Sequence, residues 1–175
     1  YDHEQLKDSL THLTNNGLRS VIIIGGGEPT AYKGFEDIVR HLKAMDIQIG
    51  VVTNGSMMKK IEAVADVLQE RDWVRLSLDS GTNNTFRAMH KPGSKKCTLE
   101  WICEHIAAIK RLNPKFMIGF SFIIVWKDCE TNDMKIIENV DEIVTAAELA
   151  KKSQFDYISF KPFLTRAELN NAEVV

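Results

Sequence analysis

The residues that could hold a ligand lie between Gly25 and Pro29, where the sequence reads GGGEP. Three successive glycines carry no Cβ, so they permit a positive φ and let a bound molecule touch the main chain. Glu28 puts a charge at that opening, which disfavours a phosphate group because a carboxylate repels it. A simple tight turn between a strand and a helix explains the same glycines.

Two more polar segments have the same form, because each follows an apolar run. Thr53-Asn54-Gly55 comes after the run 48–52, and Asp79-Ser80 closes the alternating segment 73–79. In parallel sheets, ligands bind at the carboxyl ends of strands, which is where all three polar segments fall. The sequence therefore predicts one ligand site built from GGGEP, TNG and LDS. For Asp79, a capping role in the turn that follows is the alternative.

Alternating apolar runs and amphipathic segments must position these loops. Val21–Ile24 is four branched apolar residues in a row, which suits a parallel strand covered on both faces, and Pro29 ends it. Strands are expected at 21–24, 48–53, 73–79, 115–125 and 155–163, and helices at 1–16, 35–45, 58–70, 99–112 and 132–152. Because the two kinds of element alternate five times without a hairpin signal, right-handed crossovers and a parallel sheet follow.

Small and polar residues are expected on one face of this sheet, opposite the helices. They are Ser77, Asp79, Gly119, Ser121, Ser159 and Lys161. A flat sheet covered on both sides would need apolar residues there instead. The pattern therefore favours an α/β fold of the partial, open TIM-like barrel type, with a ligand in its lumen and a single domain over residues 1–175.

Composition limits the partners of this chain. It has 175 residues, 44% of them hydrophobic, and a net charge of -2, which gives no global attraction to nucleic acid or to an anionic membrane. No apolar run reaches the roughly 18 residues that a bilayer requires, so a cytoplasmic location is expected. The three cysteines, Cys97, Cys103 and Cys129, have no metal-ligand spacing, so no metal site is predicted.

Taken in order, GGGEPT, VTNGS and LSLDS resemble the core of a radical S-adenosylmethionine enzyme, and the resemblance covers nearly the whole chain. It implies five of the usual six barrel strands and S-adenosylmethionine as a cofactor. It also implies an unknown small-molecule or peptide substrate, together with an electron donor such as flavodoxin or ferredoxin.

The resemblance also assigns residues to the cofactor. The glycine loop with Glu28 would hold the methionyl amino group, since carbonyls and a carboxylate are the acceptors that an ammonium needs. Ser77 and Asp79 would face the ribose or the methionyl carboxylate, which Arg87 would neutralise. The cofactor-binding residues implied are thus Gly25, Gly26, Gly27, Glu28, Thr53, Asn54, Ser77, Asp79, Arg87, Ser121, Phe160 and Lys161, of which the last three would approach the adenine or the substrate. No catalytic residue is assigned.

The sequence departs from the family at the iron–sulfur cluster. In that family a Cys-x3-Cys-x2-Cys loop between the first strand and the first helix holds a [4Fe–4S] cluster. The sequence begins at that helix, and its three cysteines lie elsewhere. The chain alone is therefore expected not to cleave S-adenosylmethionine reductively.

Two explanations of this departure are open. Either the chain is an amino-truncated piece of a radical enzyme, or it is a natural relative that binds S-adenosylmethionine or another adenosyl ligand without radical chemistry. Without a preceding strand, Val21–Ile24 becomes an apolar sheet edge with no charge or proline to blunt it. That unprotected edge favours truncation.

Overall fold

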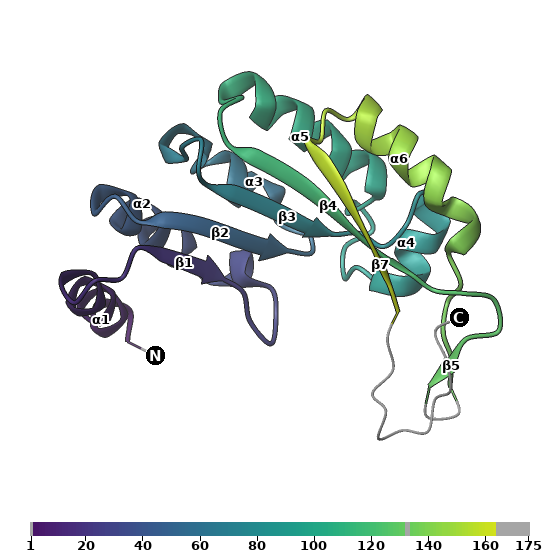
Figure 1. Ribbon diagram of the computed structural model, residues 1–175, viewed down its shortest axis with the longest axis horizontal. Coiled ribbons are helices and arrows are strands. Elements are labelled where there is room, and N and C mark those ends of the chain that lie inside the picture. The colour runs from purple at the N-terminus through teal and green to yellow at the C-terminus, as the bar shows by residue number, and fades with distance from the viewer. Residues whose placement is uncertain (1, 132–133, 164–175) are drawn as a thin grey trace.

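A computed structural model of the chain describes residues 2–131 and 134–163 and shows an open parallel sheet (Figure 1). The strand order is β1-β2-β3-β4-β7, and every neighbouring pair is parallel. The strands are β1 (Ser20–Ile23), β2 (Gln48–Thr53), β3 (Trp73–Ser77), β4 (Met117–Ile124) and β7 (Tyr157–Pro162). This confirms the predicted five-stranded, partial barrel.

The helices cover one face of the sheet and leave the other face open (Figure 1). They are α1 (His3–Asn15), α2 (Phe35–Ala44), α3 (Met58–Glu62), α4 (Asn83–His90), α5 (Leu99–Leu112) and α6 (Ile143–Lys152). The short 3-10 turns are η1 (Pro29–Ala31), η2 (Ala65–Val67) and η3 (Val140–Glu142). Alternate strand residues such as Val74, Leu76 and Phe120 are fully buried against the helices. The open face therefore carries the residues between them, as predicted.

Helix ends follow local rules where the sequence supplies a cap. Asp2 begins α1 by accepting hydrogen bonds from the amides of Glu4 and Gln5, and Thr98 begins α5 by accepting one from the amide of Trp101. Gly17 has a φ of 101° just after α1, a conformation that favours glycine.

The helix predicted over 58–70 is wrong in length, because α3 ends at Glu62. Carbonyl groups beyond it bond to side chains from other elements instead of to the next helical turn. The Asn113 amide donates to the carbonyls of Ala65 and Leu68, both at 2.8 Å. Arg40 donates to the carbonyl of Ala63 at 2.7 Å. These long-range bonds replace the helical ones and turn the chain into η2.

Two other predictions are corrected in the second half of the chain. The sequence predicts no helix between the strand 73–79 and the helix 99–112, but α4 lies there. The helix predicted over 132–152 begins only at Ile143, and its first two residues, 132 and 133, lie outside the described residues. A short antiparallel hairpin, β5 (Glu130–Thr131) and β6 (Met134–Lys135), precedes it. The buried Asn139 holds this region out of the helix, since its side chain donates to the carbonyls of Asp79 and Ile123 and accepts from the amide of Val125.

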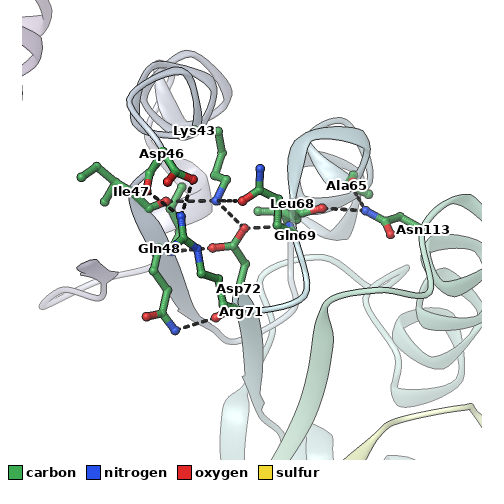
Figure 2. Close-up of polar contacts among 11 residues, drawn as sticks. Lys43, Asp46, Ile47, Gln48, Ala65, Leu68, Gln69, Arg71, Asp72 and Asn113 are labelled. Carbon is green, nitrogen blue, oxygen red and sulfur yellow. Dashed lines mark hydrogen bonds and ion pairs between the residues drawn. The ribbon is translucent and has the colours of Figure 1, made fainter. Parts of the chain in front are cut away.

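A buried ion pair fixes the amino ends of β2 and β3 (Figure 2). Lys43 Nζ of α2 lies 2.7 Å from Asp72 Oδ2, and the two side chains are only 4% and 0% exposed. Asp72 also accepts the amides of Ile49 and Gln69, each at 2.7 Å, while Lys43 donates to the carbonyl of Ile47 at 3.0 Å. Every charge is thus both paired and hydrogen-bonded, which a buried pair needs.

Asp72→Asn should destabilise the fold strongly, because it leaves the buried Lys43 ammonium uncompensated. We expect a loss of about 3–5 kcal/mol in the free energy of unfolding, measured by urea denaturation. Asp66→Asn is the control, since Asp66 pairs with Arg40 on the surface at 64% exposure and such pairs contribute little. A midpoint that moves no further in Asp72→Asn than in Asp66→Asn would contradict this role.

Candidate functional site

Glu28 joins the glycine loop to the end of β2. Its Oε1 accepts hydrogen bonds from the amide and hydroxyl of Thr30, at 3.0 and 2.5 Å, and from the hydroxyl of Thr53 at 2.6 Å. Its Oε2 accepts the Asn54 amide at 2.7 Å. Three residues that the sequence assigned to one site therefore meet at a single carboxylate. Thr30 is a fourth member that the sequence did not indicate.

The Glu28 carboxylate still has room for a ligand donor. A carboxylate offers about four lone-pair positions over its two oxygens. Oε1 already takes three hydrogen bonds, whereas Oε2 takes one, from Asn54. The side chain is only half-buried. Oε2 can therefore accept a hydrogen bond from an ammonium group without giving up a bond that holds the loop.

The three loop glycines are not explained by the fold itself. Among the described residues, the only glycines with positive φ are Gly17 and Gly55, so the loop does not use the positive φ that its glycines permit. A Cβ at Gly26 or Gly27 would meet no atom within 4 Å, and one at Gly25 would meet only the Gly27 nitrogen at that limit. Neither conformation nor internal packing requires glycine here, and the bare main chain is open to close approach by a ligand. With Glu28, this bare main chain offers carbonyl and carboxylate acceptors to a ligand that carries hydrogen-bond donors.

The loop opens beside the edge of the sheet. A hollow of about 260 Å³ is lined by Ile24, Gly25, Gly27, Glu28 and neighbouring residues of η1 and α2. β1 is the first strand of the sheet, and its Ile22 side chain is 58% exposed. The apolar edge expected from the sequence is therefore present, next to the glycine loop.

Three serines form a row across the inner face, just below the strand ends. Ser77 lies opposite Ser121, and Ser121 lies opposite Ser159 in the register of β3, β4 and β7. Ser121 is 7% exposed. The sequence named Ser77 and Ser121 as cofactor-binding residues, and the structure brings them together with a third hydroxyl.

Asp79 is occupied in holding the fold. It has a φ of 49°, and its Oδ1 accepts the Ile123 amide at 2.7 Å, which links the end of β3 to β4. Its Oδ2 lies 3.5 Å from His90 Nε2. The side chain is 12% exposed. Asp79 thus links the ends of two strands and does not cap a helix, since the N-cap of α4 is Thr82. Any contact of Asp79 with a ribose would have to use Oδ2.

The remaining three predicted residues lie apart from one another. Phe160 faces the helices, where its ring centroid is 5.4 Å from that of the buried Phe122. Lys161 is the next residue, so it lies on the inner face, and it is exposed. Arg87 lies in α4 and is half-buried. The structure therefore does not bring Phe160 together with Lys161.

Glu142 is a residue that sequence reasoning missed. From η3, its carboxylate accepts the amides of Gly81 and Thr82 and the hydroxyls of Thr82 and Thr85, at 2.6 to 3.1 Å. Burial alone would raise the pKa of Glu142, but these hydrogen bonds outweigh it and hold the pKa below its usual 4.5. Glu142 thereby fixes the first turn of α4, which carries Arg87. Because its partners lie about 60 residues away, no local pattern could have revealed it.

The described cysteines do not fit an iron–sulfur cluster. Cys97 and Cys103 are 4% and 8% exposed, and burial raises the pKa of both thiols, which disfavours the thiolate that a cluster binds. Within residues 2–131 and 134–163, no group of three or more His, Cys, Asp or Glu side chains converges on a metal position.

Sequence comparison decides the family. The model of the radical SAM superfamily matches residues 1–135. The chain belongs to the radical SAM superfamily. Its curated relatives include a GTPase Obg of Brachyspira hyodysenteriae, which is 28% identical over 89% of this chain and 22% of that protein. An S-adenosylmethionine-dependent nucleotide dehydratase of Selenomonas ruminantium is 24% identical over 69% of this chain and 45% of that protein. The chain thus spans less than half the length of either relative.

Solved structures of the superfamily share the fold. SuiB of Streptococcus suis bound to S-adenosylmethionine matches with a TM-score of 0.65 and 14% identity, over 95% of this chain and 35% of that chain. SuiB bound to its precursor peptide SuiA matches with a TM-score of 0.64 and 15% identity, over 92% of this chain and 32% of that chain. As in the family, the sheet is an open parallel barrel. No helix in the described part of this radical SAM chain is long and apolar enough to cross a membrane.

Glu142→Gln should destabilise the chain in a pH-dependent way. Because the folded-state pKa of Glu142 is lowered, its contribution is fully present above pH about 4.5 and is lost as the pH falls through the folded-state pKa. The difference in unfolding free energy between wild type and Glu142→Gln should therefore be largest at neutral pH and shrink below pH about 4.5. Urea denaturation across this range measures it.

Glu138→Gln is the matched control for this prediction. Glu138 is an exposed carboxylate on the same segment, so its removal should leave the pH profile close to that of wild type. A difference in unfolding free energy between wild type and Glu142→Gln that stays constant with pH would contradict the role of Glu142 in fixing α4.

Proposed function

We propose that this chain is the S-adenosylmethionine-binding core of a radical SAM enzyme. The observation that carries the proposal is the Glu28 carboxylate, which Thr30, Thr53 and Asn54 hold in place while Oε2 keeps an acceptor position open beside bare glycines. An ammonium requires such a set of acceptors, and a charge-assisted hydrogen bond of this kind is among the stronger polar contacts.

The proposed roles of the other residues follow from the direction in which a bound cofactor would extend from Glu28. With its amino group at Glu28, the methionyl carboxylate would be neutralised by Arg87, whose helix is fixed by Glu142. The ribose would meet the row of hydroxyls that begins at Ser77. Ser121 and Lys161 would face the adenine or the substrate. Phe160 supports this part of β7 from the helix side.

This chain's own share of the reaction is binding, orientation and exclusion of water. S-adenosylmethionine, once bound and reduced, supplies the hydrogen abstraction that is typical of the superfamily. The described cysteines do not hold the [4Fe–4S] cluster, so we place its ligands, and the docking of a flavodoxin or ferredoxin, in a longer parent protein. The substrate is a small molecule or a peptide, and SuiB, which binds a precursor peptide, shows the second kind within this fold.

A second candidate function is a module that binds S-adenosylmethionine or another adenosyl ligand without radical chemistry. It is favoured by one observation, namely that Cys97 and Cys103 are buried in the core with raised pKa values. Release of 5'-deoxyadenosine by the parent protein under reducing conditions separates the two functions, because a binding module would release none.

Glu28→Gln should weaken the binding of S-adenosylmethionine by about tenfold or more, measured by titration calorimetry. The substitution removes the charge that faces the ammonium, and hydrogen bonds to charged groups are worth about 1.5–3 kcal/mol. Gln keeps the length of the side chain and one carbonyl oxygen for Thr30 and Thr53.

Thr30→Val is the control that separates binding from stability. It removes the hydroxyl that donates to Oε1 but leaves the Glu28 charge, so it should lower the stability of the loop more than the affinity. The site assignment fails if Glu28→Gln binds S-adenosylmethionine as tightly as wild type.

A further inference from the structure

Two aromatic rings lie flat on the inner face of the sheet because glycines beneath them leave room. A Cβ at Gly50 in β2 would come within 2.3 Å of Trp73, and a Cβ at Gly119 in β4 would come within 1.8 Å of Tyr157. Any other residue at either position would push the ring off the sheet. These glycines are therefore matched to the rings of the neighbouring strands, since Gly50 pairs with Trp73 and Gly119 with Tyr157.

The two rings and two further side chains line an open hollow. Trp73, Arg75, Met117 and Tyr157 line about 300 Å³ on the inner face, and we refer to these four residues as the floor cluster. Trp73, Met117 and Tyr157 are the first residues of β3, β4 and β7, and Arg75 is the middle residue of β3. The floor cluster is thus distinct from the cofactor residues, which lie at the carboxyl ends.

Arg75 brings an unneutralised charge into this hollow. Its Cζ lies 5.7 Å from the centroid of the Trp73 ring, a cation–π arrangement that orients the guanidinium. Asp156, which precedes Tyr157 in the chain, is already paired with Lys110 Nζ, at 2.8 Å, and with the amide of Ile118, at 2.6 Å. The hydrogen bonds and ion pairs found among the described residues leave the guanidinium donors of Arg75 available. Half-burial of the side chain makes these donors worth more than they would be in water.

We propose that the floor cluster binds an oxyanion of the substrate, a carboxylate or a phosphate, with Arg75 as its anchor. A guanidinium presents its donors in a planar fork that matches two oxygens of one anionic group. The rings of Trp73 and Tyr157 supply flat apolar walls for the carbon skeleton that carries this group. This inference rests on the proposed function, because it names the substrate class of the same barrel.

The position of Arg75 sets how such a substrate would lie. Ser77 is two residues further along and is the last residue of β3, which places it about 7 Å from the level of Arg75. A molecule anchored at Arg75 would therefore extend past the serine row of Ser77, Ser121 and Ser159 toward the glycine loop. Its reacting atom would meet the cofactor at the carboxyl end of the sheet.

Phenyl phosphate and benzoate test the proposal, since each joins an oxyanion to a flat apolar ring. Titration calorimetry on the full chain should show saturable binding of at least one probe, and the tighter one indicates whether the substrate group is phosphate or carboxylate. Arg75→Gln should weaken that binding by about tenfold or more. The affinity of Arg75→Lys should lie between those of wild type and Arg75→Gln, because lysine keeps the charge but not the planar set of donors. Arg111→Gln, at an exposed position in α5, should bind as wild type does.

The proposal is overturned if neither probe binds saturably, or if Arg75→Gln binds both as tightly as wild type. Circular dichroism spectra that match wild type show that the variants fold. S-adenosylmethionine titrations of the same proteins separate this inference from the proposed function. Arg75→Gln should keep its affinity for S-adenosylmethionine, while Glu28→Gln should lose that affinity and still bind the probe.

Discussion

The carboxyl end of the sheet depends on the hydrogen bonds of one carboxylate. Glu28 crosses from the glycine loop to β2 and takes donors from Thr30, Thr53 and Asn54. These bonds tie the loop to the fold at a point where its glycines have no side chains that could pack against other elements. The same bonds fix Oε2 where a ligand can use it. The stability of the loop and the proposed recognition of a ligand therefore depend on one arrangement of donors.

Other carboxylates of this open barrel also connect segments that are distant in the sequence. Asp72, Asp79 and Glu142 each accept backbone amides from a distant segment, namely Ile49, Ile123 and Gly81. An open sheet has fewer strand neighbours than a closed barrel, so its loops need other partners for their main-chain groups. The ion pair of Lys43 with Asp72 stabilises the amino end of the sheet. The loops at the opposite, carboxyl end are the ones that can contact ligands.

The sequence predicted the strands well because their signal is local. Branched apolar runs mark β1 and β2, alternation marks β3, and Thr98 marks the start of α5. The errors have a common cause in contacts between distant residues. Asn113 ends the helical region after α3, and Asn139 delays the start of α6. For the site, the sequence indicated Glu28 and the strand ends, but the partners that hold Glu28 became visible only once the strands were paired.

The central claim is that the glycine loop and the end of β2 bind S-adenosylmethionine. The most direct measurement is a nitrogen-15 spectrum of the labelled chain titrated with S-adenosylmethionine, because it reports each amide separately. We expect saturable shifts for the amides of Gly26, Gly27 and Asn54, and no shift for Ile49 beside the buried Asp72. Shifts confined to the amino end of the sheet, or unchanged loop amides at saturating ligand, would contradict the account.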